Sequence, residues 1–122
     1  MTTYLWFNAV AYAVFAIWCT LRPEQTSTFL GLRPEGAKGM SEFIAVYGGI
    51  EAGLAAFFAI AAVKPALHAP AVLMAACVYV GLVAFRSIVL VRSDFAIGTA
   101  SYAYTFELVM AVIAIALLLR AR

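Results

Sequence analysis

The chain has 122 residues, enough for one domain, and its composition is that of a membrane protein. Hydrophobic residues make up 66% of it and charged residues only 11%, whereas soluble domains have roughly 45–50% and about 25%. The net charge of +2 is small and the basic residues are scattered, so the sequence predicts no nucleic-acid partner. The two cysteines lie in apolar runs and give no disulfide framework.

Four apolar runs occupy most of the chain, and each is near the ~20 residues that a transmembrane helix requires. They are residues 3–21, 42–63, 70–91 and 102–119. We therefore expect an all-α fold, a four-transmembrane-helix bundle that forms a single integral membrane domain over residues 1–122. The first run lacks the basic n-region and the A-x-A-like site of a secretory signal, so we expect it to be a retained helix.

An even number of spans predicts that both termini lie on one side of the membrane, with loops 22–41 and 92–101 together on the other. The positive-inside rule does not choose the cytoplasmic side, because the Lys and Arg residues are divided about evenly between the two sides. The expected location is the bacterial inner membrane, with membrane lipid as the surroundings.

The first loop is expected to contain a short interfacial segment between the first two spanning helices. Pro23 and Glu24 are typical of the first turn of a helix, and Phe29, Leu30 and Leu32 interrupt a polar stretch. A helical turn lying on the membrane fits this pattern. The alternative is a lid over whatever opens on that side, since long loops in compact domains are often functional.

The 3–21 helix has a stripe of polar and aromatic residues that is expected to face the bundle. Its members recur at spacings of three and four: Tyr4, Asn8, Tyr12, Phe15 and Cys19. We interpret Asn8 as a residue that hydrogen-bonds a neighbouring helix, with ligand contact as the alternative.

The 42–63 helix is predicted to have a small flank that packs and a large flank that meets lipid. A projection at about 100° per residue gives the small flank as Ala45, Gly48, Ala52, Ala56 and Ala59. It gives the large flank as Phe43, Val46, Ile50, Leu54 and Phe57. Glu51 lies at the edge between them, with Tyr47 one turn before it. Gly49 and Gly53 form a GxxxG motif behind Glu51, and a homodimer through them is one interpretation.

Glu51, Arg86 and Glu107 are the predicted site, because an ionisable group at membrane depth needs a partner and is by default a functional hypothesis. Counted from the side of the two loops, Arg86 and Glu107 lie about six residues into their helices and Glu51 about nine to ten. At ~1.5 Å per residue all three are within roughly one turn in depth. Glu107 shares a stripe of small residues with Ala100, Ala103, Ala111 and Ala114.

Two kinds of role remain open for this cluster. Arg86 can satisfy both carboxylates in a structural ion cluster. The three side chains together carry one net negative charge, so either one glutamate is protonated or a cation compensates the excess charge. Tyrosines that could line a small-molecule or lipid binding pocket beside the cluster are Tyr12, Tyr47, Tyr79 and Tyr104.

The alternative functions are a proton-coupled small-molecule transporter, an accessory subunit of a membrane complex and an intramembrane isomerase-type enzyme. The sequence shows no nucleophile with a base, no His-rich metal set and no phosphate loop. It therefore predicts neither metal nor cofactor and favours a protein without enzymatic activity. His68, the one histidine, is expected in the loop between the 42–63 and 70–91 helices.

The chain also resembles a family of small bacterial four-helix membrane proteins catalogued as a domain of unknown function. The resemblance covers nearly the whole chain and rests on these segments: Phe29-Leu30-Gly31-Leu32, Ser41-Glu42-Phe43, Ala45-Val46-Tyr47-Gly48-Gly49, Arg86 and Glu107-Leu108. An Arg often follows the Glu-Phe pair in the family, whereas this chain has Ile44. The resemblance implies the fold and the site positions and says nothing about a substrate.

Overall fold

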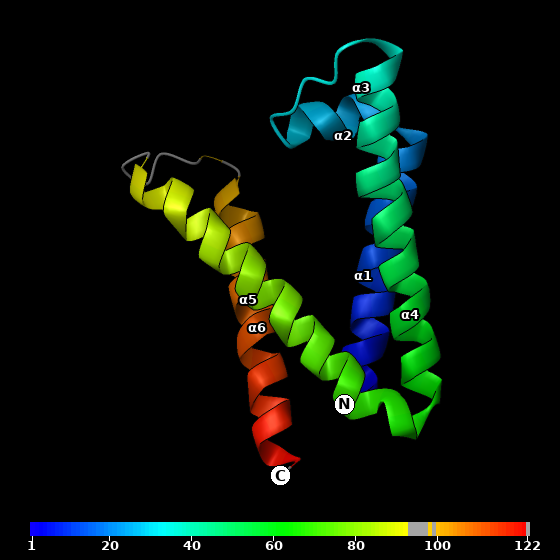
Figure 1. Cartoon of the computed structure of the whole chain (residues 1–122), viewed down its shortest axis with the longest axis vertical. Helices are drawn as coiled ribbons and strands as arrows, with labels where there is room; N and C mark the ends of the chain where they lie inside the picture. The colour runs from blue at the N-terminus through cyan, green and yellow to red at the C-terminus, as the bar shows by residue number, and fades with distance from the viewer. Residues whose placement is uncertain (93–97, 99, 122) are drawn as a thin grey trace. The chain divides into compact units, whose positions relative to one another are not determined.

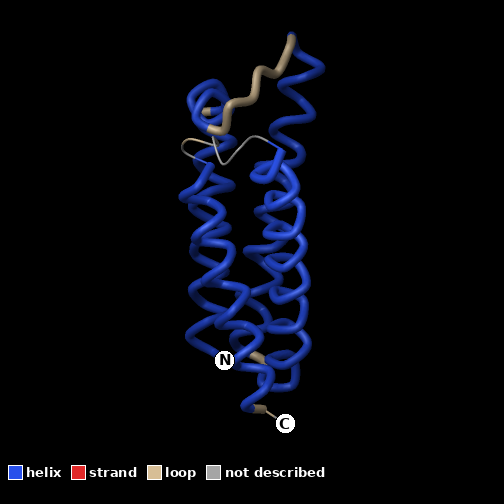
Figure 2. The backbone as a smooth tube through the Cα atoms, turned by 90° about the vertical axis from the view of Figure 1, so that its left-hand side faces the viewer, coloured by secondary structure: helices blue, strands red, loops and turns tan. Residues whose placement is uncertain are grey.

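The computed structural model describes residues 1–92, 98 and 100–121, and these are almost entirely helical, with no strand among them (Figures 1 and 2). In chain order the elements are α1 (Thr2–Leu21), α2 (Pro23–Phe29), α3 (Gly36–Phe43), η1 (Ile44–Ile50), α4 (Glu51–Val63), η2 (Pro65–Leu67), α5 (His68–Arg92) and α6 (Ala100–Arg120). Here η1 is a π-helical segment and η2 a short 3₁₀ helix. The expected all-α class is confirmed. Most of the expected loop 92–101, and Arg122, lie outside the described residues.

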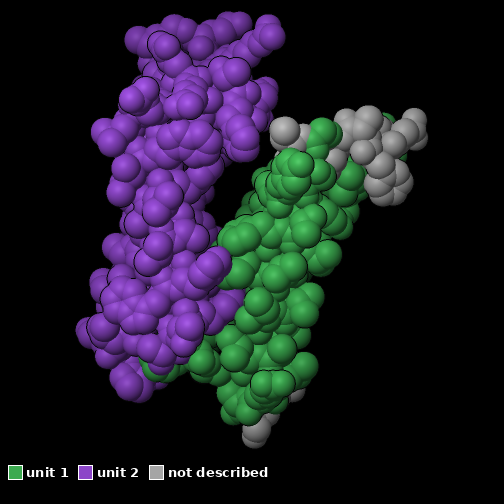
Figure 3. Space-filling view, turned by 180° about the vertical axis from the view of Figure 1, so that it is seen from behind, with its two compact units in different colours: residues 1, 67–122 green, residues 2–66 purple. Residues whose placement is uncertain are grey.

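The chain divides into two compact units, which we describe separately (Figure 3). The N-terminal unit is Thr2–Ala66, and the C-terminal unit is Leu67–Arg122 together with Met1. In the N-terminal unit α1 packs along η1 and α4, and in the C-terminal unit α5 packs along α6. Each unit therefore contains one antiparallel pair of long helices.

Four helical stretches are long and apolar enough to cross a membrane. They are Thr2–Leu21, Gly36–Val63, Pro65–Arg92 and Ser101–Arg120. Their outer faces are apolar as well: on α1, for example, Val10, Val14 and Ile17 are all more than half exposed. Soluble monomers rarely expose apolar surface so continuously, whereas a helix facing lipid must.

The second long apolar helix begins earlier than predicted, at Gly36 instead of residue 42. The predicted first turn of α2 is present, with Pro23 at its start. A Schellman motif ends α2: the Leu32 N–H donates to the Ser27 carbonyl over 2.8 Å, and Gly31 takes a φ of 72° that favours glycine. Gly36, with a φ of 61°, then starts α3, so the residues from Gly36 to Met40 are helical too.

The short helix α2 lies across the end of α1 and beside α3 (Figure 1). Thr26 and Ser27 are buried, while Phe29 is 53% exposed. The Phe29 ring contacts Trp18 of α1 at a centroid distance of 5.4 Å. An outward aromatic face at the end of the apolar helix α1 is compatible with the interfacial segment, which stays a prediction.

The predicted flanks of the second helix are partly wrong. Gly48 is buried as expected, but Ala52 and Ala56 are exposed, and Phe43 and Phe58 are buried instead. Ala45 is exposed too. The physical reason is η1, because hydrogen bonds from i to i+5 widen the turn, so a projection that assumes an α-helix throughout misplaces the residues around it.

The close approach of η1 to α1 depends on Gly48. A Cβ atom on Gly48 would lie 2.6 Å from Thr20 Oγ1, a distance that real side chains do not tolerate. Thr20 Oγ1 is itself held, since it donates to the Ala16 carbonyl over 2.8 Å. A glycine here lets the two backbones approach, as small residues commonly do between membrane helices.

The predicted inward stripe of α1 is confirmed. Tyr4, Asn8 and Cys19 are buried, and Tyr12 and Phe15 are half-buried.

On α6, Glu107, Ala111 and Ala114 are buried and Ala103 is half-buried. The Ala100 side chain lies outside the described residues. His68 begins α5 and does not lie in a loop, because Lys64 and η2 make the whole connection between α4 and α5.

Candidate functional site

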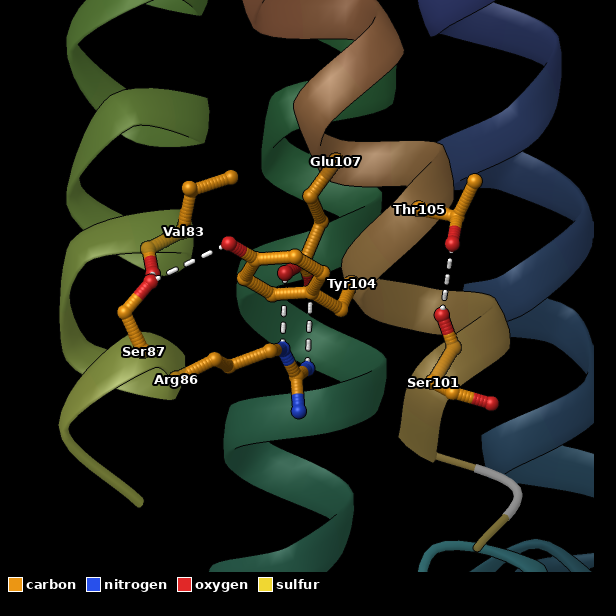
Figure 4. A network of polar contacts seen from close by, with 7 residues as sticks. All are labelled: Val83, Arg86, Ser87, Ser101, Tyr104, Thr105 and Glu107. Carbon is orange, nitrogen blue, oxygen red and sulfur yellow. Dashed lines mark hydrogen bonds and ion pairs between the residues drawn. The ribbon is translucent and has the colours of Figure 1, made fainter. Parts of the chain in front are cut away.

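Arg86 on α5 and Glu107 on α6 form a bidentate ion pair (Figure 4). Arg86 Nε donates to Glu107 Oε2 over 2.7 Å, and Arg86 Nη2 donates to Glu107 Oε1 over 3.0 Å. The Glu107 side chain is 9% exposed and that of Arg86 38%. Parallel donation from a guanidinium is the strongest way to satisfy a buried carboxylate, so this part of the predicted cluster is present.

A second polar contact lies one turn away on the same two helices (Figure 4). Ser87 Oγ and Tyr104 Oη are 3.2 Å apart, and Ser87 Oγ also donates to the Val83 carbonyl over 2.7 Å. Because the Ser87 hydrogen goes to Val83, Tyr104 is the donor in the contact between the side chains. Tyr104 thus ties α6 to α5 and is engaged with a neighbour of Arg86.

Tyr79 belongs to the packed interior of the C-terminal unit. Its side chain is 2% exposed and meets Phe106 of α6 edge-on, with ring centroids 6.2 Å apart. We therefore interpret Tyr79 as a packing residue, which its position among apolar neighbours on the helix also favours.

Glu51 lies in the N-terminal unit and is arranged differently from Glu107. It is the first residue of α4, directly after the π-helical segment η1, and its side chain is half-buried. Its Oε2 atom is buried, and no hydrogen-bond donor of the described chain reaches it. π-Helical segments are rare and are frequent at functional sites. The predicted contact of Glu51 with Arg86 stays a prediction.

The Glu51 carboxylate acts electrostatically on a thiol of its own unit, that of Cys19. Cys19 is fully buried on α1, and the Glu51 carboxylate is near enough to act on it electrostatically. The thiol is also within hydrogen-bonding reach of the Thr26 side chain on α2, which is fully buried as well. The thiol of α1 and the hydroxyl of α2 therefore meet inside the N-terminal unit.

The other predicted residues of the N-terminal unit pack against aromatic rings or backbone. Tyr47 stacks on Phe43 with ring centroids 4.9 Å apart, and Tyr12 stacks on Phe58 at 5.6 Å. Asn8 Nδ2 donates to the Tyr4 carbonyl within its own helix over 2.7 Å.

Gly49 and Gly53 are exposed, and a Cβ atom on either would meet nothing within 4 Å. Their face is thus open, and the homodimer through them stays a prediction.

Among the described residues, no group of three or more His, Cys, Asp or Glu side chains could hold a metal ion. Sequence reasoning missed Cys19, Thr26 and Ser87 as members of these polar contacts. Cys19 had a signal, since it lies on the predicted inward stripe of α1, and Ser87 follows Arg86 directly. Thr26 had none, because only the fold-back of α2 brings it to the end of α1.

The chain was compared with models of protein families, with curated proteins and with solved structures. No family model, curated protein or solved structure matches it significantly. The resemblance to the family of unknown function therefore stays a prediction, and the functional argument rests on the site itself.

Proposed function

We propose that this chain is a small integral membrane protein that binds a hydrophobic or amphipathic small molecule. The positively charged group of the small molecule binds the Glu51 carboxylate and takes the place of a proton there. In this proposal the four apolar stretches are the spanning helices of one bundle, and α2 lies at the membrane interface. The observation that carries the proposal is the buried Glu51 Oε2 atom, which has no donor among the described residues.

The argument starts from the cost of charge at that position. Glu51 lies near the middle of the apolar stretch Gly36–Val63. An ionised carboxylate at the centre of a spanning helix costs roughly 2.5–3.5 kcal/mol, unless a proton or a counter-ion neutralises it. The Glu51 carboxylate can bind a proton or a cation but not both, so a cation that binds there displaces the proton.

The Arg86–Glu107 pair supports the assignment of this role to Glu51 and not to Glu107. Both Glu107 oxygens accept hydrogen bonds from Arg86, so this carboxylate is already neutralised by a neighbour within its own unit. The pair is best understood as the structural half of the predicted cluster. The excess negative charge that the sequence predicts then belongs to Glu51.

A hydrophobic carbodiimide tests the proposal, because it modifies protonated carboxyls in apolar surroundings. With dicyclohexylcarbodiimide, the carboxyl proton moves to a reagent nitrogen while the carboxyl oxygen bonds to the central carbon. The acyl group then migrates to nitrogen as a stable N-acylurea, and nothing leaves. We expect mass spectrometry of the protein in lipid nanodiscs to find the adduct on Glu51 and not on Glu107. Decyldimethylamine, a protonated tertiary amine, should protect Glu51.

Two variants make the result specific. Glu51→Gln should remove the adduct, whereas Glu42→Gln, which alters an exposed carboxylate on α3, should leave it unchanged. The proposal would be overturned if the carbodiimide did not modify Glu51. It would also be overturned if the amine did not protect Glu51 at the highest concentration that the nanodiscs withstand.

A further inference from the structure

An open groove runs along one side of α5, within the C-terminal unit, and the Arg86–Glu107 pair borders it. Its volume is about 620 Å³, a size that is common among small-molecule sites. The described residues that line it lie between Cys77 and Val89, and Arg86 is the one charged residue among them. At ~1.5 Å per residue the groove is about 18 Å long, which is enough for a long alkyl chain.

The groove exists because position 81 has no side chain. A Cβ atom on Gly81 would meet nothing within 4 Å, so this glycine, unlike Gly48, serves no close approach of helices among the described residues. Glycine is a poor helix former, so packing gives no reason for it here. One turn further on, Phe85 is 75% exposed. Helical side chains lean toward the N-terminus, so the Phe85 ring borders the space that Gly81 leaves.

Arg86 supplies hydrogen-bond donors near one end of the groove. Its Nε and Nη2 atoms donate to Glu107, whereas Nη1 points away from Glu107 and has no acceptor among the described residues (Figure 4). The Arg86 side chain is 38% exposed, so Nη1 can be reached from the groove. A groove with donors near the Val89 end and apolar walls toward Cys77 matches an amphiphile whose head group lies at Arg86.

The ion pair favours a head group without charge. Arg86 and Glu107 together carry no net charge, and both belong to long apolar helices. An anionic head group would add an uncompensated charge to these surroundings, which is costly. A carbonyl oxygen accepts from the Nη1 hydrogens and adds no charge.

We infer that the α5 groove binds an acyl lipid of the bilayer. The ester carbonyl of the lipid accepts a hydrogen bond from Arg86 Nη1, and the acyl chain lies past Gly81 toward Cys77. This site belongs to the C-terminal unit and does not depend on cation binding at Glu51.

Two matched probes test the carbonyl contact and leave the Arg86–Glu107 pair intact. Monopalmitoylglycerol and 1-O-hexadecylglycerol share the glycerol head and the chain length, but the second has an ether where the first has an ester. Native mass spectrometry of the protein in detergent micelles measures their affinities. We expect the ester to bind roughly ten-fold or more tightly, because a charged donor bonds its carbonyl. Equal affinities, or tighter binding of anionic palmitate than of the ester, would overturn the inference.

A groove-filling variant tests the location. Gly81→Leu places a side chain in the groove and should weaken binding of the ester roughly ten-fold or more. Its fold should be retained, because the new Cβ atom meets nothing within 4 Å, and the melting temperature in detergent checks this. Ala84→Leu adds bulk at an exposed residue of α5 outside the groove and should leave the affinity unchanged. If Gly81→Leu bound the ester as tightly as the unaltered protein, the groove would not be the site.

Discussion

Glu107 in the C-terminal unit and Glu51 in the N-terminal unit both belong to apolar helical stretches, and the two carboxylates have opposite surroundings. In the C-terminal unit, Glu107 receives two hydrogen bonds from Arg86. In the N-terminal unit, Glu51 has a buried oxygen that no described donor reaches. The same kind of side chain is therefore a structural partner in one unit and an unsatisfied group in the other.

The difference arises from how each helix pair is built. The facing sides of α5 and α6 bring an arginine and a glutamate within direct reach, so their polar groups satisfy one another. In the N-terminal unit, α1 packs against η1 and α4 through a buried glycine and stacked aromatic rings. Among the contacts described, this packing brings no cation to Glu51. Stability is therefore expected to depend on the polar pair in one unit and on close packing in the other.

Removal of the guanidinium should have the largest effect on stability. Loss of one partner of a fully buried pair costs about 3–5 kcal/mol. Arg86 is 38% exposed, so for Arg86→Ala we expect the lower part of that range or less, about 2–4 kcal/mol. The change should appear as a lower melting temperature in detergent.

Arg86→Lys should fall between Arg86→Ala and the unaltered protein, because an ammonium cannot donate in parallel to both oxygens. Arg92→Ala, at an exposed position at the end of α5, is the control. An Arg86→Ala protein as stable as the unaltered one would show that the pair is not structural.

Gly48→Ala should have the next largest effect, through packing in the N-terminal unit. Its Cβ atom would lie 2.6 Å from Thr20 Oγ1, and rotation of Thr20 would break its bond to the Ala16 carbonyl. We expect a loss of about 1–3 kcal/mol, as for other overpacked positions. The measurement is again thermal unfolding in detergent.

The double variant Thr20→Ala with Gly48→Ala should recover much of that loss. Gly81→Ala on α5, where a Cβ atom would meet nothing within 4 Å, should be neutral or slightly stabilising. A Gly48→Ala protein that behaves like Gly81→Ala would mean that η1 does not need the close approach.

The sequence predicted much of this arrangement, because composition and helical spacing report directly on burial in apolar helices. The four spans and the inward stripe of α1 follow from hydropathy and from spacings of three and four. The pairing of Arg86 with Glu107 was predicted because isolated charges in a membrane need partners.

The rest depends on features that spacing does not encode. No residue pattern announces a π-helical segment, and Ile44–Ile50 shifts the faces of the second helix, so Phe43 and Phe58 are buried where alanines were expected. The polar contact of Cys19 with Thr26 arises because α2 folds back over α1, a tertiary event that local propensity does not report.

The hydroxyl contact beside the ion pair should contribute less than either of the first two features. Tyr104→Phe removes one neutral hydrogen bond and Ser87→Ala removes two, because Ser87 Oγ also donates to the Val83 carbonyl, so we expect losses of about 0.5–1.5 kcal/mol for each bond. Because the two groups bond each other, the double variant should cost less than the sum of the single ones. Tyr102→Phe, at a residue that is 76% exposed, is the control. Strict additivity would show that the 3.2 Å contact contributes nothing.

Glu51→Gln should have the smallest effect on stability, and it decides the comparison between the two carboxylates. The amide keeps the shape of the side chain and replaces a carboxyl group whose buried oxygen no described donor reaches. We therefore expect its melting temperature to equal or slightly exceed that of the unaltered protein, within about 0.5 kcal/mol. Glu107→Gln should instead be clearly destabilised, because Arg86 would lose its counter-ion.

If Glu51→Gln cost as much stability as Glu107→Gln, Glu51 would be a structural partner, as in the cluster of three charges that the sequence predicts. If it costs nothing and abolishes carbodiimide labelling and amine binding, Glu51 is the carboxylate that the fold leaves available for a ligand.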